Sequence, residues 1–384
     1  MKLIHRNDMH SIKAQDLKGA KVFYRIDGNV DIINQKIQND FRLQAILPTL
    51  QLLTNAGAHI TVATHIGRPK GIQKELSTAP LKNWFTEHGF PDINLLENLR
   101  FNGGERTRDR EEALAFAREL AHGMDYYIND AWGLLHRNDT SITVLPTLFA
   151  PEKRAFGLLV EKELAALESL KNSPKAPYVV ILGGGKVETK LPVIERLIKK
   201  QNNGKPAVST IIILPALSFT FMRAMGLQTG ASLVDEALIP HAGLIMELAQ
   251  KNGVELVFPL DYTYIFDQNK IGTCDAIGIP KNGKGMAVGP RSLELFESYL
   301  KNAQTIFFNG AMGNQDQPET MKPLDALLYM ISQSNSYSVV GGGNSVAEVQ
   351  NCGFMDKIDY CSTGGGSTLM YISDGPMPGL DAML

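Results

Sequence analysis

The chain has 384 residues, a formal net charge of −2 and 44% hydrophobic residues. This length predicts two domains or one large α/β domain, with enough apolar side chains for buried cores. The small net charge argues against a nucleic-acid or membrane partner held by bulk charge. The longest apolar run, residues 211–217, is too short to cross a bilayer.

The cysteines and the N-terminus indicate a reduced, cytoplasmic protein. Cys274, Cys352 and Cys361 form neither a CxxC pair nor a spacing typical of metal ligands. The first ten residues, MKLIHRNDMH, are polar and are not expected to act as a signal peptide.

Strands and helices alternate along the first half of the chain. The apolar patterns predict strands at residues 21–26, 59–64, 93–97 and 126–128, and helices at 42–53 and 108–122. This alternation is typical of a parallel sheet with crossover helices. In such sheets, ligands bind beyond the carboxyl ends of the strands.

Polar and basic side chains gather just beyond these strand ends. They are Arg25, Asp27, Asn29, His65, Arg68, Arg100, His136 and Arg137. A lone surface arginine is usually only solvated, but a set at successive strand ends is harder to dismiss. Because arginine binds phosphate and carboxylate in a bidentate manner, the set predicts a pocket for a small anion that bears both groups.

A helix predicted at 161–171 and the broken segment NSPKAP at 172–177 mark a domain boundary. We therefore expect a first domain at 1–160, a connector at 161–177 and a second domain at 178–369, which leaves a tail at 370–384. The tail must dock somewhere to be ordered. Strands in the second half are expected near 211–214, 255–259, 305–308, 338–340 and 358–361.

The segment YVVILGGGKVETK, residues 178–190, is typical of a strand that runs into glycines and opens a helix. Such a corner can hold phosphate, because glycine allows close backbone approach and the helix N-terminus favours anions. One triplet fits a turn without a ligand equally well. Two further triplets, at 341–343 and 364–366, favour one shared polyphosphate site.

Taken in order, these motifs resemble the phosphoglycerate kinase family over almost the whole chain. The matching segments are RIDGN (25–29), Arg42, HIGRPKG (65–71), ENLRF (97–101), NDAWG (129–133), HR (136–137), GGGKVETK (183–190), NGAMG (309–313), GGGNS (341–345), STGGG (362–366) and MPGL (377–380). The resemblance implies two doubly wound, Rossmann-like parallel-sheet domains joined by a helix. It also implies that the tail at 370–384 returns to the first domain.

The family activity implied by the resemblance is reversible phosphoryl transfer between ATP and 3-phosphoglycerate, with Mg²⁺ carried by the nucleotide. A monomer that binds these small molecules, and neither nucleic acid nor membrane, is expected. The implied phosphoglycerate ligands are Asp27, Asn29, Arg42, His65, Arg68, Arg100 and Arg137. The implied nucleotide site comprises Gly183, Gly184, Gly185, Lys186, Lys190, Asn309, Asp316, Gly341, Gly342, Gly343, Asn344 and Ser345.

Transfer itself is assigned to four of the matched residues, Arg42, Lys190, Gly342 and Gly365. Cationic and N–H donors stabilise the charge on the transferring phosphoryl group. Because Arg42 and Lys190 fall in different predicted domains, a hinge near residues 161–177 is expected.

The chain departs from the family pattern mainly in the nucleotide half. Asn344 replaces the usual metal-ligating Asp, and it would be a weak, uncharged ligand for Mg²⁺. NGAMGNQD replaces NGPxGVFE, so that Asp316 takes the place of a ribose-binding Glu, and LPAL at 214–217 replaces a glycine triplet.

These departures leave two interpretations open. One is a working kinase with full or reduced turnover, and the other is an impaired paralogue that binds phosphoglycerate or nucleotide. A dinucleotide-dependent dehydrogenase is disfavoured, because no GxGxxG follows the first strand.

Overall fold

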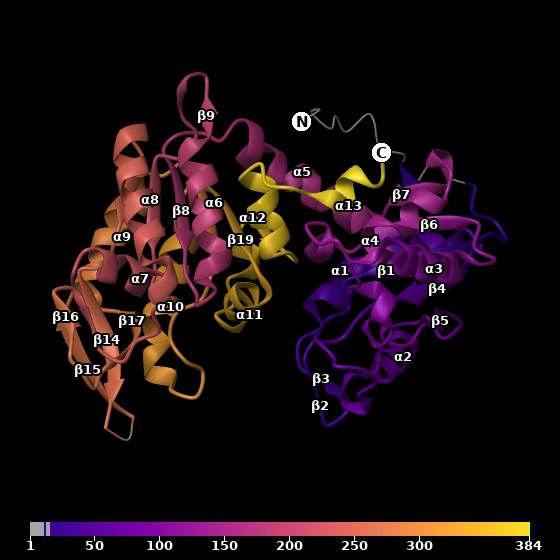
Figure 1. Ribbon diagram of the computed structural model, residues 1–384, viewed down its shortest axis with the longest axis horizontal. Coiled ribbons are helices and arrows are strands. Elements are labelled where there is room, and N and C mark those ends of the chain that lie inside the picture. The colour runs from indigo at the N-terminus through magenta and orange to yellow at the C-terminus, as the bar shows by residue number, and fades with distance from the viewer. Residues whose placement is uncertain (1–10, 13–15, 268) are drawn as a thin grey trace. The chain divides into compact units, whose positions relative to one another are not determined.

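The computed structural model describes residues 11–12, 16–267 and 269–384. The N-terminal decapeptide, for which no signal-peptide role is expected, lies outside these residues. No helix among the described residues is long and apolar enough to cross a membrane. The chain divides into two compact units, Met1–Ala166 with Pro376–Leu384, and Leu167–Gly375 (Figure 1).

The first unit is built on a five-stranded parallel sheet of order β5-β4-β1-β6-β7. Its strands are β1 (Lys21–Ile26), β4 (His59–Ala63), β5 (Asn94–Leu95), β6 (Tyr126–Asp130) and β7 (Arg154–Phe156), with a small hairpin of β2 (Ile32–Ile33) and β3 (Lys36–Ile37). Its helices are α1 (Phe41–Asn55), α2 (Ala79–Glu87), α3 (Arg110–Ala121), α4 (Thr140–Thr143), α5 (Leu158–Asn172), which continues into the second unit, and α13 (Pro378–Asp381).

Burial explains why these strands read as continuous apolar runs. All residues of β6 and all but the first of β1 are buried, as expected when helices cover both faces of a parallel sheet. Helix α1 packs onto the sheet through Leu43, Ile46, Leu50 and Leu53, whose spacing places them on one helical face.

The C-terminal residues 376–384 belong to the first unit. The amide of Gly379 in α13 donates to the carbonyl of Leu135 over 2.8 Å. A Cβ at Gly379 would lie 2.7 Å from a methyl of Ile142, so only glycine fits this close approach. The sequence boundaries were expected at 160 and 370, whereas the compact units change over at 166 and 376.

The second unit is built on a six-stranded parallel sheet of order β13-β11-β8-β18-β19-β20. Its strands are β8 (Tyr178–Leu182), β11 (Thr210–Ile213), β13 (Glu255–Val257), β18 (Thr305–Asn309), β19 (Tyr337–Gly341) and β20 (Tyr360–Ser362). Its helices are α6 (Val187–Lys199), α7 (Leu217–Ala224), α8 (Ile239–Asn252), α9 (Pro290–Asn302), α10 (Lys322–Ser332), α11 (Gly343–Asn351) and α12 (Gly366–Ile372).

The second unit also carries an antiparallel sheet of order β15-β14-β17, which the sequence analysis did not predict. Its strands are β14 (Asp261–Phe266), β15 (Lys270–Asp275) and β17 (Lys284–Val288). Two short pairs complete the unit, β9 (Gln201–Asn202) with β10 (Lys205–Pro206), and β12 (Gln228–Thr229) with β16 (Gly278–Ile279). Polar residues alternate with apolar ones in β14, so that its pattern differs from that of the buried parallel strands.

A buried carboxylate holds the start of α5. Asp130, the last residue of β6, accepts hydrogen bonds from the Val160 amide at 3.0 Å, the Tyr24 hydroxyl at 2.8 Å and the Thr49 hydroxyl at 2.5 Å. The side chain thus satisfies an orphan N–H in the first turn of α5 from across the fold. Burial raises the pKa of Asp130 to about 6, although these hydrogen bonds favour the charged form.

We predict that Asp130→Asn changes the pH dependence of stability in one direction. A carboxyl whose pKa rises on folding, from 3.8 to about 6, stabilises the fold fully below pH 3.8, and this contribution is lost as the pH rises through about 6. Between pH 4 and pH 7, the wild type should therefore lose up to about 3 kcal/mol of unfolding free energy relative to Asp130→Asn.

Tryptophan fluorescence during urea unfolding measures this effect, because Trp84 and Trp132, the two tryptophans of the chain, both lie in the first unit. The exposed Asp92 provides the control variant Asp92→Asn, for which no such difference is expected. The assignment fails if wild type and Asp130→Asn keep a constant stability difference over this pH range.

Candidate active site

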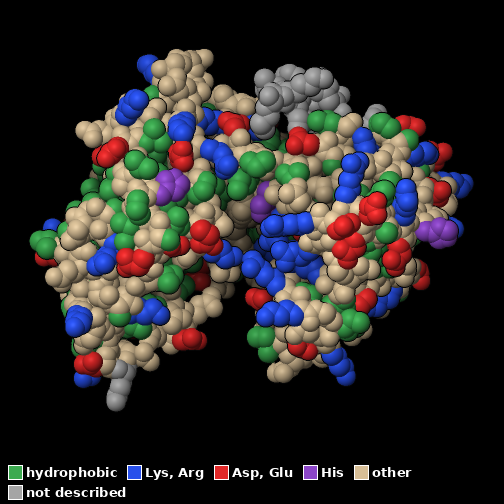
Figure 2. All heavy atoms as spheres, in the orientation of Figure 1, with side chains coloured by type: hydrophobic (Ala, Val, Ile, Leu, Met, Phe, Trp, Pro, Cys, Tyr) green, Lys and Arg blue, Asp and Glu red, His purple; other side chains and the backbone are tan. Residues whose placement is uncertain are grey.

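The first unit gathers basic side chains at the carboxyl ends of its parallel strands, which all meet at one edge of the sheet. We call this group the arginine site, and its members are Asp27, Asn29, Arg42, His65, Arg68, Arg100, His136 and Arg137. Figure 2 shows Lys and Arg side chains gathered in a dense patch on this unit.

Residues that follow β1 and β4 hydrogen-bond to one another at one end of the arginine site. Arg42, in the first turn of α1, donates to the carbonyl of Asn29 at 2.8 Å and lies 3.6 Å from the Asp27 carboxylate. The side-chain oxygen of Asn29 accepts from the amide of Gly67 at 2.7 Å. Gly133 allows Asp27 to approach, because a Cβ there would lie 2.2 Å from the Asp27 carboxylate.

Several buried nitrogens of this site have no hydrogen-bond partner among the described residues. They are Nδ1 of His65, Nδ1 of His136, Nε of Arg100 and Nε of Arg137. A buried donor without a partner costs roughly 1–3 kcal/mol, so such a cluster indicates a place for a ligand. An anion with several oxygens would satisfy these nitrogens together.

Burial and the positive charge of the site lower the pKa of both of its histidines. Burial, followed by the charges of Arg100, Arg25, Arg137 and Arg42, holds the pKa of His65 well below its ordinary value. Burial and then the charge of Arg137 lower the pKa of His136 to about 4. Both imidazoles are therefore neutral at pH 7, in a field that favours anions.

Arg68 is exposed and lines an open cavity of about 460 Å³. The other lining residues are Arg106, Thr107, Arg108, His136, Arg137, Asn138 and Asp139. Four arginines and one carboxylate make this cavity strongly positive, and a small dianion fits its size and charge.

Arg25 belongs to a buried network rather than to this cavity. Its guanidinium is fully buried, donates to the Ser141 hydroxyl at 2.7 Å and pairs with Glu105 at 3.5 Å. Its charge contributes to the lowered pKa of His65, but the hydrogen bonds that it donates go to buried groups of the core.

In the second unit, the glycine corners come together. They follow the adjacent strands β8, β18, β19 and β20. The amide of Gly183 donates to the Asn309 carbonyl at 3.1 Å, and the Asn309 side chain donates to the Gly341 carbonyl at 2.6 Å. A Cβ at Gly365 would lie 3.2 Å from Cα of Gly342, so the corners touch backbone to backbone.

Three of these glycines, including Gly184 with φ +89°, have a backbone conformation that favours glycine. Gly342 has φ +100°, and Gly310 has φ +127° with its would-be Cβ only 2.4 Å from the Gly183 carbonyl. Among the described residues, no side chain caps the N-termini of α6, α11 or α12, which open from these corners. The dipole of a helix N-terminus favours an anion at such corners. We call this arrangement the glycine site.

Lys190 is half-buried one turn into α6, and its ammonium lies 3.6 Å from the point where a Cβ on Gly184 would sit. Burial, and then the charge of the exposed Lys186, lower the pKa of Lys190 to about 8, with Glu188 as a partial offset. A buried cation without a carboxylate at contact is typical of a site that awaits a negatively charged ligand.

Comparison with known proteins agrees with this arrangement. A family model described as phosphoglycerate kinase matches residues 12–89 and 88–375. Phosphoglycerate kinases of Streptomyces avermitilis and Chlamydia trachomatis are 35% and 34% identical to the chain, over 96% and 98% of its length and 98% of theirs. The chain belongs to the phosphoglycerate kinase family.

Solved structures of the family share the fold. The phosphoglycerate kinase of Pyrococcus horikoshii superposes with a TM-score of 0.85 at 25% identity, and that of Coxiella burnetii with 0.79 at 27%. Each comparison covers 98% of both chains. The predicted class of two Rossmann-like parallel-sheet domains is confirmed.

The residues that depart from the family pattern lie around the glycine site. A Cβ on Gly183 would meet Leu214 at 2.9 Å and the carbonyl of Ala311 at 3.3 Å, so both altered loops flank this corner. Ala216 has φ +70° and ψ −55°, a conformation that non-glycine residues rarely adopt. The loop thus keeps a glycine-like backbone after losing the glycine.

Asn344 and Asp316 are both exposed. Asn344 is the second residue of α11, beside Ser345, whose hydroxyl accepts from the Gly310 amide at 3.1 Å. Asp316 lies in a turn bridged by Asn314 and Gln317, and its amide donates to the Asn314 side chain at 3.1 Å.

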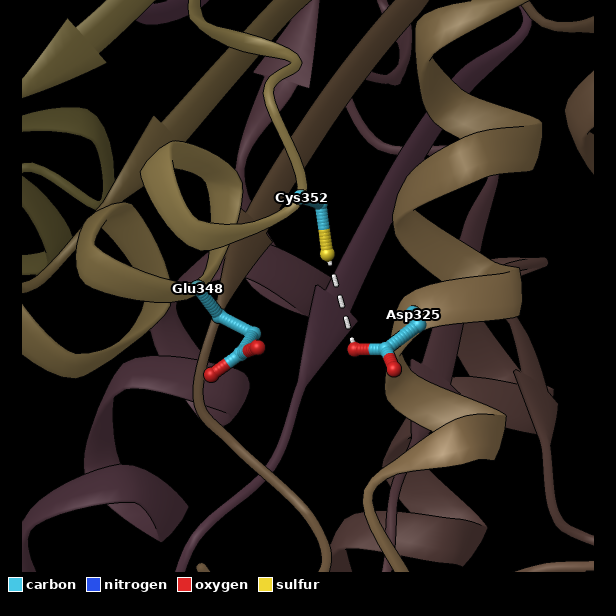
Figure 3. Close-up of side chains that lie close together, drawn as sticks. All are labelled: Asp325, Glu348 and Cys352. Carbon is cyan, nitrogen blue, oxygen red and sulfur yellow. Dashed lines mark hydrogen bonds between the residues drawn. The ribbon is translucent and has the colours of Figure 1, made fainter. Parts of the chain in front are cut away.

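Glu348, a possible substitute for the missing metal ligand, faces another group. Figure 3 shows it converging with Asp325 of α10 and Cys352, and their ligand atoms lie within 4.8 Å of one another. Burial and then Asp325 raise the pKa of Glu348, and the same two causes raise the pKa of Cys352 to about 11. Both shifts oppose the charged forms that bind metals best.

Sequence reasoning missed Asp139 and Leu233 as neighbours of these sites. Asp139 is two residues beyond Arg137 and pairs with Arg100 at 3.0 Å. Leu233 lies against Gly185, where it would be 2.9 Å from an added Cβ. An acidic residue next to HR was a usable signal for Asp139, whereas nothing local links Leu233 to a glycine 48 positions away.

We predict that Lys190 gives polyphosphate binding a pH dependence above neutrality. An ammonium with a pKa of about 8 is lost as the pH rises from 7 to 9, so tripolyphosphate should bind the wild type about tenfold more weakly at pH 9. Lys190→Arg keeps its charge and should show a much smaller loss, and calorimetry measures both.

Lys199, an exposed residue of α6 paired with Glu195, provides the control. Lys199→Arg should follow the wild-type curve, and the comparison removes the titration of the polyphosphate itself. Parallel curves for wild type and Lys190→Arg would show that Lys190 does not titrate in this range.

Proposed function

We propose that this protein is an active phosphoglycerate kinase. It transfers a phosphoryl group reversibly between ATP and the carboxylate of 3-phosphoglycerate, giving ADP and 1,3-bisphosphoglycerate, as in glycolysis and gluconeogenesis. Family membership supports a kinase that uses these small molecules.

The observation that carries the proposal is the set of unpartnered buried nitrogens in the arginine site. His65, His136, Arg100 and Arg137 each have one buried nitrogen without a hydrogen-bond partner among the described residues. A phosphate and a carboxylate on one small molecule offer enough oxygens for all four, together with the exposed Arg68. We propose that Asp27 and Asn29 accept hydrogen bonds from the C2 hydroxyl group of 3-phosphoglycerate.

The glycine site suits the nucleotide phosphates. Its three backbone corners and the uncapped helix N-termini supply N–H donors, and Lys186 and Lys190 supply full charges. Asn309, Gly341, Gly343 and Ser345 hold the corners in place, and Asp316 is proposed to reach the ribose.

Transfer in this proposal depends on stabilised charge rather than on covalent chemistry. Arg42, Lys190 and the amides at Gly342 and Gly365 would surround the transferring phosphoryl group. Mg²⁺ bound to the nucleotide would neutralise phosphate charge and could take the amide oxygen of the exposed Asn344 as one neutral ligand. The hinge near 161–177 stays a prediction.

A second candidate is a paralogue that binds these ligands without rapid turnover. The loss of the carboxylate at Asn344 and the altered loops at Leu214 and Ala311 favour it. In either case we propose a cytoplasmic monomer that binds neither nucleic acid nor membranes, in keeping with a net charge of −2.

We predict turnover in a coupled assay with ATP and 3-phosphoglycerate, and a dependence on Arg68. Arg68→Ala removes a charged contact to the substrate anion and should weaken 3-phosphoglycerate binding about tenfold to a hundredfold by calorimetry. Arg118→Ala, on the exposed side of α3, serves as the matched control and should bind normally.

The two candidates separate in this experiment. Turnover supports the kinase, whereas tight binding of both ligands without turnover supports the binding protein. Equal binding of 3-phosphoglycerate by wild type and Arg68→Ala would contradict the substrate assignment in both cases.

We predict that Asn344 limits the use of metal. Asn344→Asp adds an anionic oxygen at this exposed position, and carboxylates are the ligands on which Mg²⁺ sites usually rely. The variant should reach half-maximal rate at about tenfold lower Mg²⁺ and turn over faster, as measured by steady-state rates across a Mg²⁺ titration.

The exposed Gln250 of α8 supplies a charge-matched control, Gln250→Glu, whose Mg²⁺ dependence should equal that of the wild type. If Asn344→Asp shows no gain over the wild type, Asn344 is not the limiting ligand.

A further inference from the structure

Asp139 occupies a helix N-cap position but does not use it. It precedes α4 and is 5% exposed, yet its side chain makes no capping hydrogen bond with any described residue. An Asp at this position normally stabilises a helix through such a bond. Its carboxylate turns instead toward the arginine site.

The carboxylate contacts two guanidinium groups. One oxygen accepts from Nη2 of Arg100 at 3.0 Å, and the other lies 4.0 Å from Nε of Arg106. The Arg100 pair is well buried, with side chains 3% and 7% exposed. A hydrogen-bonded pair at this depth has a fixed geometry, unlike a surface ion pair.

Asp139 and Gly67 together fix the orientation of Arg100. Nη1 of Arg100 donates to the Gly67 carbonyl at 2.7 Å, while Nη2 is held by Asp139. The remaining nitrogen, Nε, is buried and has no partner among the described residues. Both terminal nitrogens of the guanidinium are thus anchored within the protein. Arg100 also lines a cavity together with Arg106, so the orientation of its guanidinium bears on what this cavity can bind.

Asp139 is also the one carboxylate among the described residues that line the 460 Å³ cavity. It faces the neutral His136 and the positive charges of Arg100, Arg106 and Arg137, which repel one another. On charge alone, a negative group here should weaken the binding of an anion. Its presence is explained if a correctly oriented Arg100 strengthens anion binding by more than the cancelled positive charge weakens it.

We infer that Asp139 is a positioning residue of the acceptor site, which holds Arg100 in the orientation that binds the substrate anion. This inference rests on the proposed function, because 3-phosphoglycerate is taken as that anion. It predicts that removal of the negative charge of Asp139 weakens the binding of an anion, which is the opposite of what charge alone predicts.

The test compares the wild type with Asp139→Asn in the full-length protein. Calorimetry should show about tenfold weaker 3-phosphoglycerate binding, and steady-state rates should show a matching rise in KM with kcat changed less than about twofold. Sulfate, which needs no fixed guanidinium direction, should bind Asp139→Asn more tightly, because the net positive charge rises.

A double-mutant cycle with Arg100→Lys separates positioning from general structural damage. A lysine presents a point charge rather than an oriented fork, so Asp139→Asn should have little further effect in that background. Asp139→Ser can still cap α4 and should reproduce the binding defect, which keeps the test valid if the Asn variant folds poorly.

The outcomes are distinguishable. If the wild type does not bind 3-phosphoglycerate, the proposed function falls and this inference with it. If it binds, but Asp139→Asn and Asp139→Ser bind as tightly or more tightly, the inference alone is overturned. A full effect of Asp139→Asn in the Arg100→Lys background would also overturn it.

Discussion

Parallel strand pairing is the constraint on which both sites depend. In each unit the pairing brings the carboxyl ends of the central strands to one edge of the sheet, where backbone hydrogen bonding stops and loops begin. Residues far apart in sequence, such as Asn29, Gly67 and Arg100, meet there and hydrogen-bond to one another. The chemistry follows from what each unit places at this edge.

The first unit places basic side chains at this edge, and each of several carboxylates pairs with one of them. Glu105 holds Arg25 inside the core, Asp27 lies beside Arg42, and Asp139 anchors Arg100. Arg68 lines the open cavity, and the Nε atoms of Arg100 and Arg137 have no hydrogen-bond partner among the described residues. These carboxylates cancel some of the positive charge around His65. Burial and the remaining positive charge of the arginines lower the pKa of His65.

In the second unit, the groups suited to hold an anion are mostly neutral. Its glycines bring backbone amides together, and three of them hold φ values that other residues adopt only under strain. Lys190 adds one partly desolvated charge. Such a backbone cradle tolerates changes in side chains around it, and this explains how the loops at Leu214 and Ala311 can differ while the corners still meet.

Much of the architecture follows from local pattern in the sequence. Buried runs such as those of β1 and β8 predict parallel strands, and the helical spacing of Leu43, Ile46, Leu50 and Leu53 predicts α1, because both periods reflect contacts within one element. Motif order was specific enough to indicate the family, and the comparisons confirmed it. The antiparallel sheet of β14, β15 and β17 was missed, since its strands alternate and are partly exposed.

Only the tertiary structure decided how the charged residues divide. Arg25 and Arg100 look alike in sequence, each at a strand end, yet Arg25 is fully buried against Glu105, whereas Arg100 pairs with Asp139 within the arginine site. The turning of Asp139 from its helix to Arg100, and the approach of Leu214 and Ala311 to Gly183, likewise depend on packing between distant segments. The sequence determines which side chains can ionise. Their protonation state and orientation depend on burial and on the distances to other groups, and both exist only once the chain is folded.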